Sequence, residues 1–139
     1  MIRKDRIQSR QEFFNLLDKE VKRATRYKYP FCILKVTLFK FPGTEEGKLQ
    51  DCFDRMIHLA EKELRESDIP GVISKNELAF ICPYTDSSNS SLVRDRLEKQ
   101  LKIYGFKKSA CEVKVERICF PGDASKISDL IDLLVKPAA

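Results

Sequence analysis

Cysteine and histidine often bind metals or act as nucleophiles, and this chain contains five cysteines and one histidine. The cysteine count is odd, the spacings are wide, and no two cysteines form a C-x-x-C motif. His58 lies in the middle of a predicted helix. We therefore predict no metal site and five free thiols, most of them buried as small hydrophobic residues. The cysteines are Cys32, Cys52, Cys82, Cys111 and Cys119.

Lysine and arginine outnumber aspartate and glutamate by 26 to 21, which gives a net charge of +5. Such an excess can attract nucleic acids or phosphorylated ligands. The basic residues are spread along the chain, however, and aromatic residues do not alternate with them to form a surface for stacking bases. We interpret most of these residues as solvated helix faces and predict no nucleic-acid partner.

The length of 139 residues suits a single domain with its own core, which we predict to span residues 1–139. No apolar run approaches the roughly 18 residues of a membrane span. The charged start Met1–Arg6 leads into an amphipathic pattern and does not resemble a signal peptide. We expect a cytoplasmic protein with no membrane partner and no cofactor.

Hydrophobic periodicity predicts an α-β-α-β-β-α-β-α order. The first helix begins with a capping box, Ser9 and Glu12, and Gly105 ends the third helix. The central βαββαβ pattern predicts an α+β ferredoxin-like fold, with helices on one face of an antiparallel sheet and an extra N-terminal helix. We expect helices at Ser9–Tyr27, Thr44–Glu66, Ser90–Tyr104 and Lys126–Val135, and strands at Phe31–Phe41, Gly71–Ile73, Glu77–Cys82 and Cys111–Phe120.

Five short motifs occur in an order and at spacings that resemble the GGDEF (diguanylate cyclase) family. Ser9–Phe13 and Glu20–Arg26 are similar to that family's opening N-R-x-x-F and E-x-x-R-A-x-R. Leu64–Asp68 resembles its L-R-x-S-D, and Phe120–Ala124 its late F-P-x-D-[AG]. The signature G-G-[DE]-E-F falls on Ser74-Lys75-Asn76-Glu77-Leu78. The resemblance covers almost the whole chain and implies a GGDEF/nucleotidyl-cyclase-like variant of the ferredoxin-like fold.

The same resemblance implies that the catalytic residues have been replaced. Family members hold two metal ions with an aspartate of the first strand and the third signature residue, which here are Thr37 and Asn76. A hydroxyl and an amide are neutral, whereas Mg²⁺ prefers charged oxygen ligands. Ser74 and Lys75 replace two glycines that let the nucleotide approach the backbone. Glu77 alone cannot hold two metals, so we predict a degenerate, non-enzymatic domain.

A separate family site that binds cyclic di-GMP has the motif R-x-x-D five residues before the signature, and Arg65 and Asp68 match it. The resemblance adds Arg96, from the following helix. A guanidinium can donate paired hydrogen bonds to guanine or phosphate, and a carboxylate can accept from guanine. If this site binds ligand, we expect Arg65 and Asp68 to be solvent-accessible and to lie beside Arg96 in one shallow basic pocket.

A plainer interpretation of these residues remains open. Asp68 precedes Ile69 and Pro70 and can simply form a turn at the end of a helix, and Arg96 can be a solvated surface residue. The chain would then be a module for dimerisation, or for docking another protein of bacterial signal transduction, with no nucleotide bound.

Overall fold

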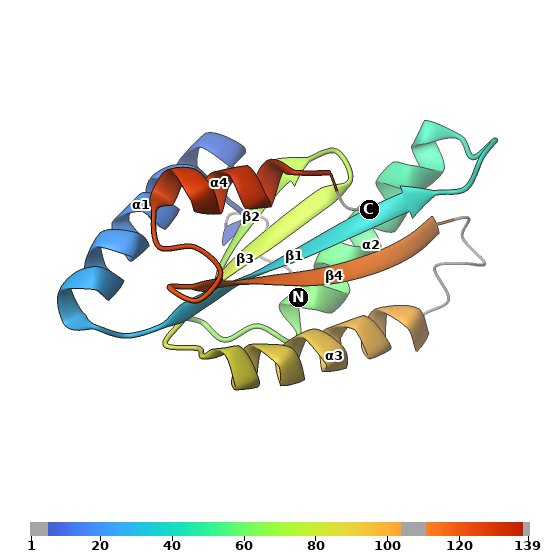
Figure 1. Cartoon of the computed structure of the whole chain (residues 1–139). Coiled ribbons are helices and arrows are strands. Elements are labelled where there is room, and N and C mark those ends of the chain that lie inside the picture. The colour runs from blue at the N-terminus through green and yellow to red at the C-terminus, as the bar shows by residue number, and fades with distance from the viewer. Residues whose placement is uncertain (1–5, 104–110, 138–139) are drawn as a thin grey trace.

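The computed structural model of the chain describes residues 6–103 and 111–137. Within these ranges, helices and strands follow one another in the predicted order (Figure 1). The expected end of the third helix at Tyr104 and Gly105 lies outside the described residues. The elements are α1 (Arg10–Tyr27), β1 (Phe31–Lys40), α2 (Glu46–Glu61), β2 (Ile69–Ser74), β3 (Glu77–Pro83), α3 (Ser87–Ile103), β4 (Cys111–Phe120) and α4 (Ile127–Val135).

The four strands form one sheet in the order β2-β3-β1-β4, and every neighbouring pair is antiparallel. This is the strand order of a ferredoxin-like βαββαβ unit, so the predicted fold class is confirmed. Strand β1 lies in the centre and pairs with β3 on one side and β4 on the other. Thr37 of β1 is therefore opposite both Glu77 and Lys114.

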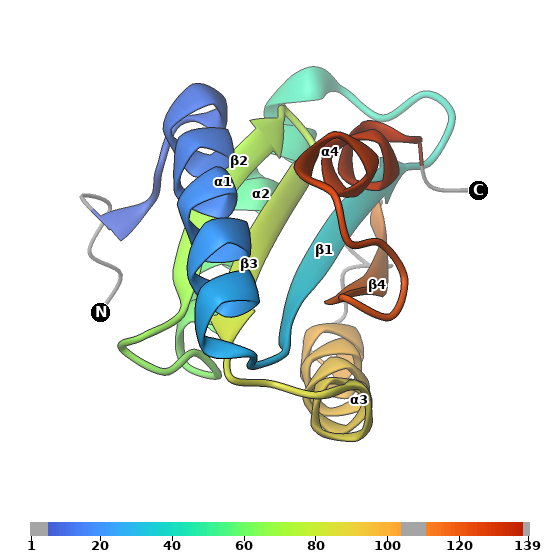
Figure 2. The same cartoon turned by 60° about the vertical axis from the view of Figure 1, so that its left-hand side comes forward.

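Helices cover both faces of the sheet, and the expectation of one covered face was wrong. Helices α2 and α3 pack on one face, while α1 and α4 pack on the other. Figure 2 shows α1 and α4 on the near side of the sheet and α2 behind it. The reason lies in β1, where apolar residues occupy both alternating sets of positions, so that each face must be buried.

Local hydrogen bonds mark the start of α1 and the end of α2. The Ser9 hydroxyl accepts a hydrogen bond from the Glu12 amide at 3.2 Å, as the predicted N-cap requires. Helix α2 ends at Glu61, five residues before the predicted Glu66. The chain then turns, and the amide of Arg65 donates to the carboxylate of Asp68 at 2.9 Å. Such a local bond between side chain and backbone competes with helix continuation.

No described helix is long and apolar enough to cross a membrane.

Candidate functional site

The hairpin at Ser74–Leu78 is closed by its own polar groups. The Ser74 hydroxyl lies 2.8 Å from Glu77 Oε1 and 2.9 Å from Asn76 Oδ1, and it can donate to either. Asn76 Nδ2 donates to the carbonyl oxygen of Leu38 at 2.9 Å, which ties the turn to the adjacent strand β1. The predicted β2–β3 hairpin is confirmed. The side-chain amide of Asn76, at its turn, is directed at the carbonyl oxygen of Leu38.

The remaining signature residues, and Thr37 of β1, lie in different surroundings. Lys75 is exposed at the turn, with its Nζ 3.6 Å from Glu46 Oε1. Leu78 is buried in the core beneath α2 and α3. The side chain of Thr37 is buried on β1, and its hydroxyl has no hydrogen-bond partner among the described residues.

A buried lysine that sequence reasoning missed reaches the last acidic residue of the signature. Lys35 lies two residues before Thr37 on β1 and is fully buried. Its Nζ is 2.8 Å from Glu77 Oε2 and donates to the carbonyl oxygen of Lys136 at 2.7 Å. A lysine inside an otherwise apolar strand was the available signal. The structure therefore provides Glu77 with an internal cation.

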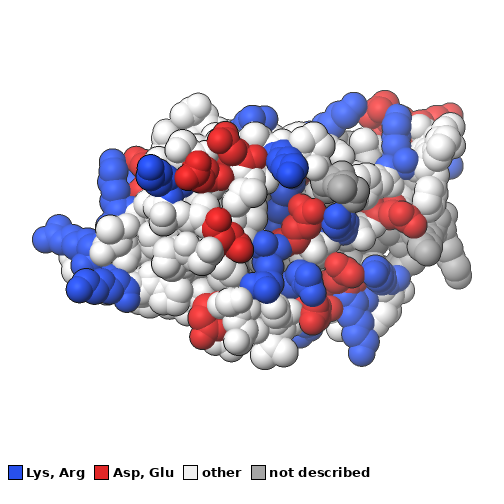
Figure 3. All heavy atoms as spheres, in the orientation of Figure 1, with Lys and Arg blue, Asp and Glu red and all other residues white. Residues whose placement is uncertain are grey.

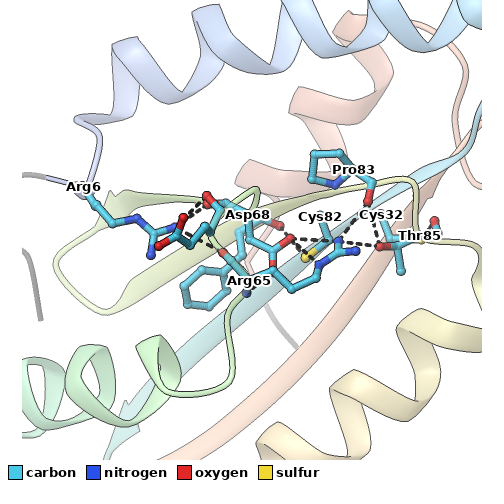
Figure 4. Close-up of polar contacts among 9 residues, drawn as sticks. Arg6, Cys32, Arg65, Asp68, Cys82, Pro83 and Thr85 are labelled. Atoms are coloured by element: carbon cyan, nitrogen blue, oxygen red, sulfur yellow. Dashed lines mark hydrogen bonds and ion pairs between the residues drawn. The ribbon is translucent and has the colours of Figure 1, made fainter. Parts of the chain in front are cut away.

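A second group of polar residues surrounds Arg65, in the turn after α2. Arg65 Nε and Nη2 donate to Asp68 Oδ1 at 3.1 and 2.9 Å (Figure 4). Nη2 also lies 2.9 Å from the carbonyl oxygen of Pro83 and from the hydroxyl of Thr85. The hydrogen bond to Asp68 raises the pKa of Arg65 above its ordinary value. Arg65 is thus fixed against the loop that follows β3.

Arg96 reaches the same place from α3. Its Nε lies 2.8 Å from Glu63 Oε2, and both residues line a cavity of about 190 Å³ together with Arg65 and Asp68. The structure therefore brings the three predicted residues to one pocket. The apolar part of the lining comes from Leu34, Cys82 and Val93, and the remaining part from Tyr84, Thr85, Asn89 and Ser90.

The accessibility predicted for Asp68 was wrong. Arg65 is about half exposed, but only 5% of Asp68 is exposed. Both carboxylate oxygens of Asp68 already accept hydrogen bonds from Arg65, one from its amide and one from its guanidinium. Asp68 therefore positions Arg65 in this structure instead of facing the solvent.

Comparisons with known proteins identify the architecture. No protein-family model and no curated protein matches the sequence. Among solved structures, a DGC protein from Thermotoga maritima aligns with a TM-score of 0.82 and 16% identity, covering 96% of each chain. The FimX GGDEF domain from Pseudomonas aeruginosa aligns at 0.77 and 13% identity, over 92% of this chain and 84% of that one. The chain has the fold of a GGDEF domain.

A third solved structure of this fold was determined with a nucleotide. The GGDEF domain of DgcB from Caulobacter crescentus, in complex with c-di-GMP, aligns with a TM-score of 0.70 and 11% identity. The alignment covers 92% of this chain and 81% of that one. At these identities the comparisons establish the shared fold.

The signature region of this GGDEF-like domain does not fit the divalent cations that its fold family uses. Thr37 and Asn76 bring no charge, and the Asn76 amide is directed at the Leu38 carbonyl. Glu77 is the remaining carboxylate of the set, and the ammonium of Lys35 already neutralises it. Among the described residues, no group of three or more histidine, cysteine or acidic side chains is arranged to hold a metal ion.

Arg6 is another residue near the pocket that sequence reasoning missed. Its Nη2 donates to the carbonyl oxygen of Asp68 at 2.8 Å and lies within 3.4 Å of the carbonyl oxygens of Arg65 and Glu66 (Figure 4). Next to it, Gln8 forms a parallel bridge with Gly71 of β2. No local pattern could have predicted these contacts, because about 60 residues separate Arg6 from its partners.

The prediction of five free thiols was also wrong. Cys32 and Cys119 form a disulfide that joins β1 to β4. The two residues are directly opposite in the register, with their Cα atoms 4.1 Å apart, so their side chains meet. The Cys32 Sγ lies 3.2 Å from the carbonyl oxygen of Thr85, in the loop that holds Arg65. The three cysteines outside the disulfide, all buried, are Cys52, Cys82 and Cys111.

The surface carries charges of both signs. On the face formed by α4, β4 and α3, lysines and arginines are interspersed with acidic residues (Figure 3). The net positive charge is therefore not gathered into one basic patch on that face. The pocket's own arginines come from the turn after α2 and from α3.

Proposed function

We propose that this GGDEF-like domain is a catalytically inactive, cytoplasmic receptor for cyclic di-GMP in bacterial signal transduction. The observation that carries the proposal is that Arg65, Asp68 and Arg96 line one pocket although they come from separate parts of the chain. Cyclic di-GMP is a dianion with two guanine bases. Guanidinium groups suit both of its recognition features, the phosphate oxygens and the acceptor edge of guanine.

Both arginines keep hydrogen-bond donors available for such a ligand. Arg65 uses Nε and Nη2, while its Nη1 has no partner among the described residues. Arg96 is paired with Glu63 through Nε, and 57% of its side chain is exposed, so its guanidinium is accessible to a ligand. Asp68 is given a positioning role here, because its oxygens are occupied by Arg65.

The size of the cavity limits what enters it. Its volume of about 190 Å³ is below the roughly 300–1,000 Å³ of pockets that enclose drug-sized ligands. We therefore place one guanine base in the pocket, with the phosphates and the second base at its rim. The c-di-GMP complex of the DgcB domain supports this ligand class for the fold.

The proposal that the domain lacks catalytic activity rests on the signature hairpin and Thr37. Phosphoryl-transfer chemistry of the family type needs metal ions to neutralise a triphosphate. In this chain Thr37 and Asn76 supply no charge to bind them, and Glu77 is held by Lys35. We therefore infer that GTP is neither bound productively nor converted.

One observation favours an alternative function, a dimerisation or partner-docking module without nucleotide. The polar groups of Asp68 and much of Arg65 are already satisfied inside the chain, and Arg96 is paired with Glu63. Protein partners also occur with this fold, since diguanylate cyclase SiaD from Pseudomonas aeruginosa was solved in complex with its activator SiaC.

Isothermal titration calorimetry with cyclic di-GMP and GTP tests the proposal. We expect cyclic di-GMP to bind and GTP to bind poorly. The Arg65→Ala variant should bind about ten- to a hundredfold more weakly, since a hydrogen bond to a charged group contributes about 1.5–3 kcal/mol. Arg96→Ala should also weaken binding. Its matched control is Arg94→Ala, because Arg94 is on the same helix but does not line the pocket.

Two results would contradict the proposal separately. If cyclic di-GMP does not bind at high micromolar concentration, the receptor function is wrong and the docking module is favoured. If the purified protein converts GTP with Mg²⁺ to a cyclic dinucleotide, and a Glu77→Gln control does not, the domain is an active enzyme.

A further inference from the structure

An aromatic residue at the edge of the pocket has no role in the description so far. Tyr84 follows the last residue of β3 and contributes to the pocket lining. Although it is a large apolar ring, 68% of it is exposed. An exposed tyrosine beside a pocket that has both apolar and charged lining residues is a common feature of surfaces that recognise ligands.

The backbone at Tyr84 is held in an unfavourable conformation. Its φ is 55°, in the left-handed region that a residue with a Cβ seldom adopts. Such outliers cluster at ligand sites, where the surrounding structure holds a side chain in a functional position. In this loop the conformation places the Tyr84 ring on the ring of Tyr29, with their centroids 3.9 Å apart and their planes inclined by 22°.

The ring beneath Tyr84 is itself firmly anchored. Tyr29 is buried, and its hydroxyl donates to Glu20 Oε2 at 2.6 Å. Glu20 is also buried and is paired with Arg23 at 3.5 Å. Tyr84 therefore rests on a rigid support and is one of the residues that line the pocket.

We infer that Tyr84 is the stacking residue of the pocket and holds the flat face of a guanine base. This inference rests on the proposed function and adds the residue that recognises the flat face of the base. Arg65 and Arg96 can read the edge of a guanine or a phosphate, but hydrogen bonds at the edge leave the flat face of the base without a contact. An aromatic ring on a fixed support supplies that contact, as in proteins that bind unpaired bases.

Four variants test the inference by calorimetry with cyclic di-GMP. Tyr84→Phe keeps the ring and should bind like the unchanged protein. Tyr84→Leu keeps apolar bulk without a ring, and with Tyr84→Ala it should bind about tenfold more weakly or worse. Tyr27→Ala is the matched control, because Tyr27 is similarly exposed at 64% but does not line the pocket. Its affinity should not change.

Nuclear magnetic resonance of the ligand separates stacking from a merely structural role. A guanine that lies on an aromatic ring has its H8 resonance shifted upfield by the ring current. We expect that shift in the bound state of the unchanged protein and of Tyr84→Phe, and its loss in Tyr84→Leu at saturating ligand. Thermal unfolding of each variant checks that the fold is retained.

The outcomes distinguish this inference from the proposed function. If cyclic di-GMP binds, Arg65→Ala weakens it and Tyr84→Leu binds normally with the same H8 shift, the stacking role is overturned and the receptor function stands. If Tyr84→Ala and Tyr27→Ala weaken binding equally, the stacking role is also overturned. If the unchanged protein does not bind cyclic di-GMP, both are overturned.

Discussion

At the scale of single residues, Lys35 shows how a charge can be kept inside this domain. Its ammonium is fully buried, which costs several kcal/mol unless nearby groups replace the lost water. Glu77 supplies the opposite charge at 2.8 Å, and the carbonyl oxygen of Lys136 supplies a further acceptor at 2.7 Å. The pair joins β1 to the signature hairpin and to the end of α4.

Removing one charge of this pair should be more harmful than removing both. We expect Lys35→Met to lower the free energy of unfolding by about 3 kcal/mol, because the mostly buried carboxylate of Glu77 would be left without an opposite charge. The double variant Lys35→Met with Glu77→Gln should regain part of that loss. Chemical denaturation with urea measures the differences.

Lys40→Met is the matched control on the same strand. Lys40 pairs with Glu46 at 2.6 Å, but both side chains are exposed, and exposed pairs contribute about 0–1 kcal/mol. A loss in Lys40→Met as large as that in Lys35→Met would contradict the role given to burial.

The site was predictable from the sequence only where a motif carried it. Arg65, Asp68 and Arg96 were found by motif and spacing, and they do line one pocket. The burial of Asp68 was missed, because sequence does not tell whether a carboxylate faces a ligand or its own neighbour. Lys35 was missed because its charge matters only through the pairing of β1 with β3, which places it near Glu77.

At the scale of elements, the turn after α2 and the segment before α1 form one unit. Asp68 holds Arg65 from inside the turn, and Arg6 holds the backbone of the same turn from outside. The predicted helix to Glu66 was too long because an apolar stripe continues to Leu64, while the polar contacts of the turn end the helix at Glu61. Periodicity detects the stripe but not those contacts.

Loss of the Arg6 side chain should loosen this turn. We expect Arg6→Ala to increase the hydrogen-exchange rate of the amides of residues 65–68, because the carbonyl oxygens there lose their donor. Mass-spectrometric hydrogen exchange measures the effect. Lys22→Ala is the control, since Lys22 pairs within α1 at 3.1 Å and does not touch the turn. Unchanged exchange in residues 65–68 would refute the clamping role of Arg6.

At the scale of the whole molecule, local patterns predicted the element order and the hairpin, and these determine the ferredoxin-like sheet. They did not predict that α1 and α4 share a face, because that depends on which side of the sheet each terminal helix returns to. The Cys32–Cys119 disulfide was missed for a related reason. It depends on the register of β1 and β4 across 87 residues of sequence.

The disulfide should stabilise the whole domain, because it closes a long loop of the unfolded chain. In protein purified without reductant and then denatured, a thiol titration should find three free thiols per chain, and five after reduction. Reduction should lower the free energy of unfolding by roughly 2–4 kcal/mol. In the native protein Cys111 should react slowly, since burial raises its pKa to about 12.

A double variant, Cys32→Ser with Cys119→Ser, provides the control for this last prediction. Its stability should not respond to reductant, and its three remaining thiols should titrate without reduction. The Cys32 Sγ contacts the loop that holds Arg65, so the variant should also show faster hydrogen exchange at Thr85. Five thiols in the unreduced, denatured wild-type protein would mean that Cys32 and Cys119 remain unbridged. Any change in hydrogen exchange at Thr85 in the double variant would then come only from the changed packing of residues 32 and 119.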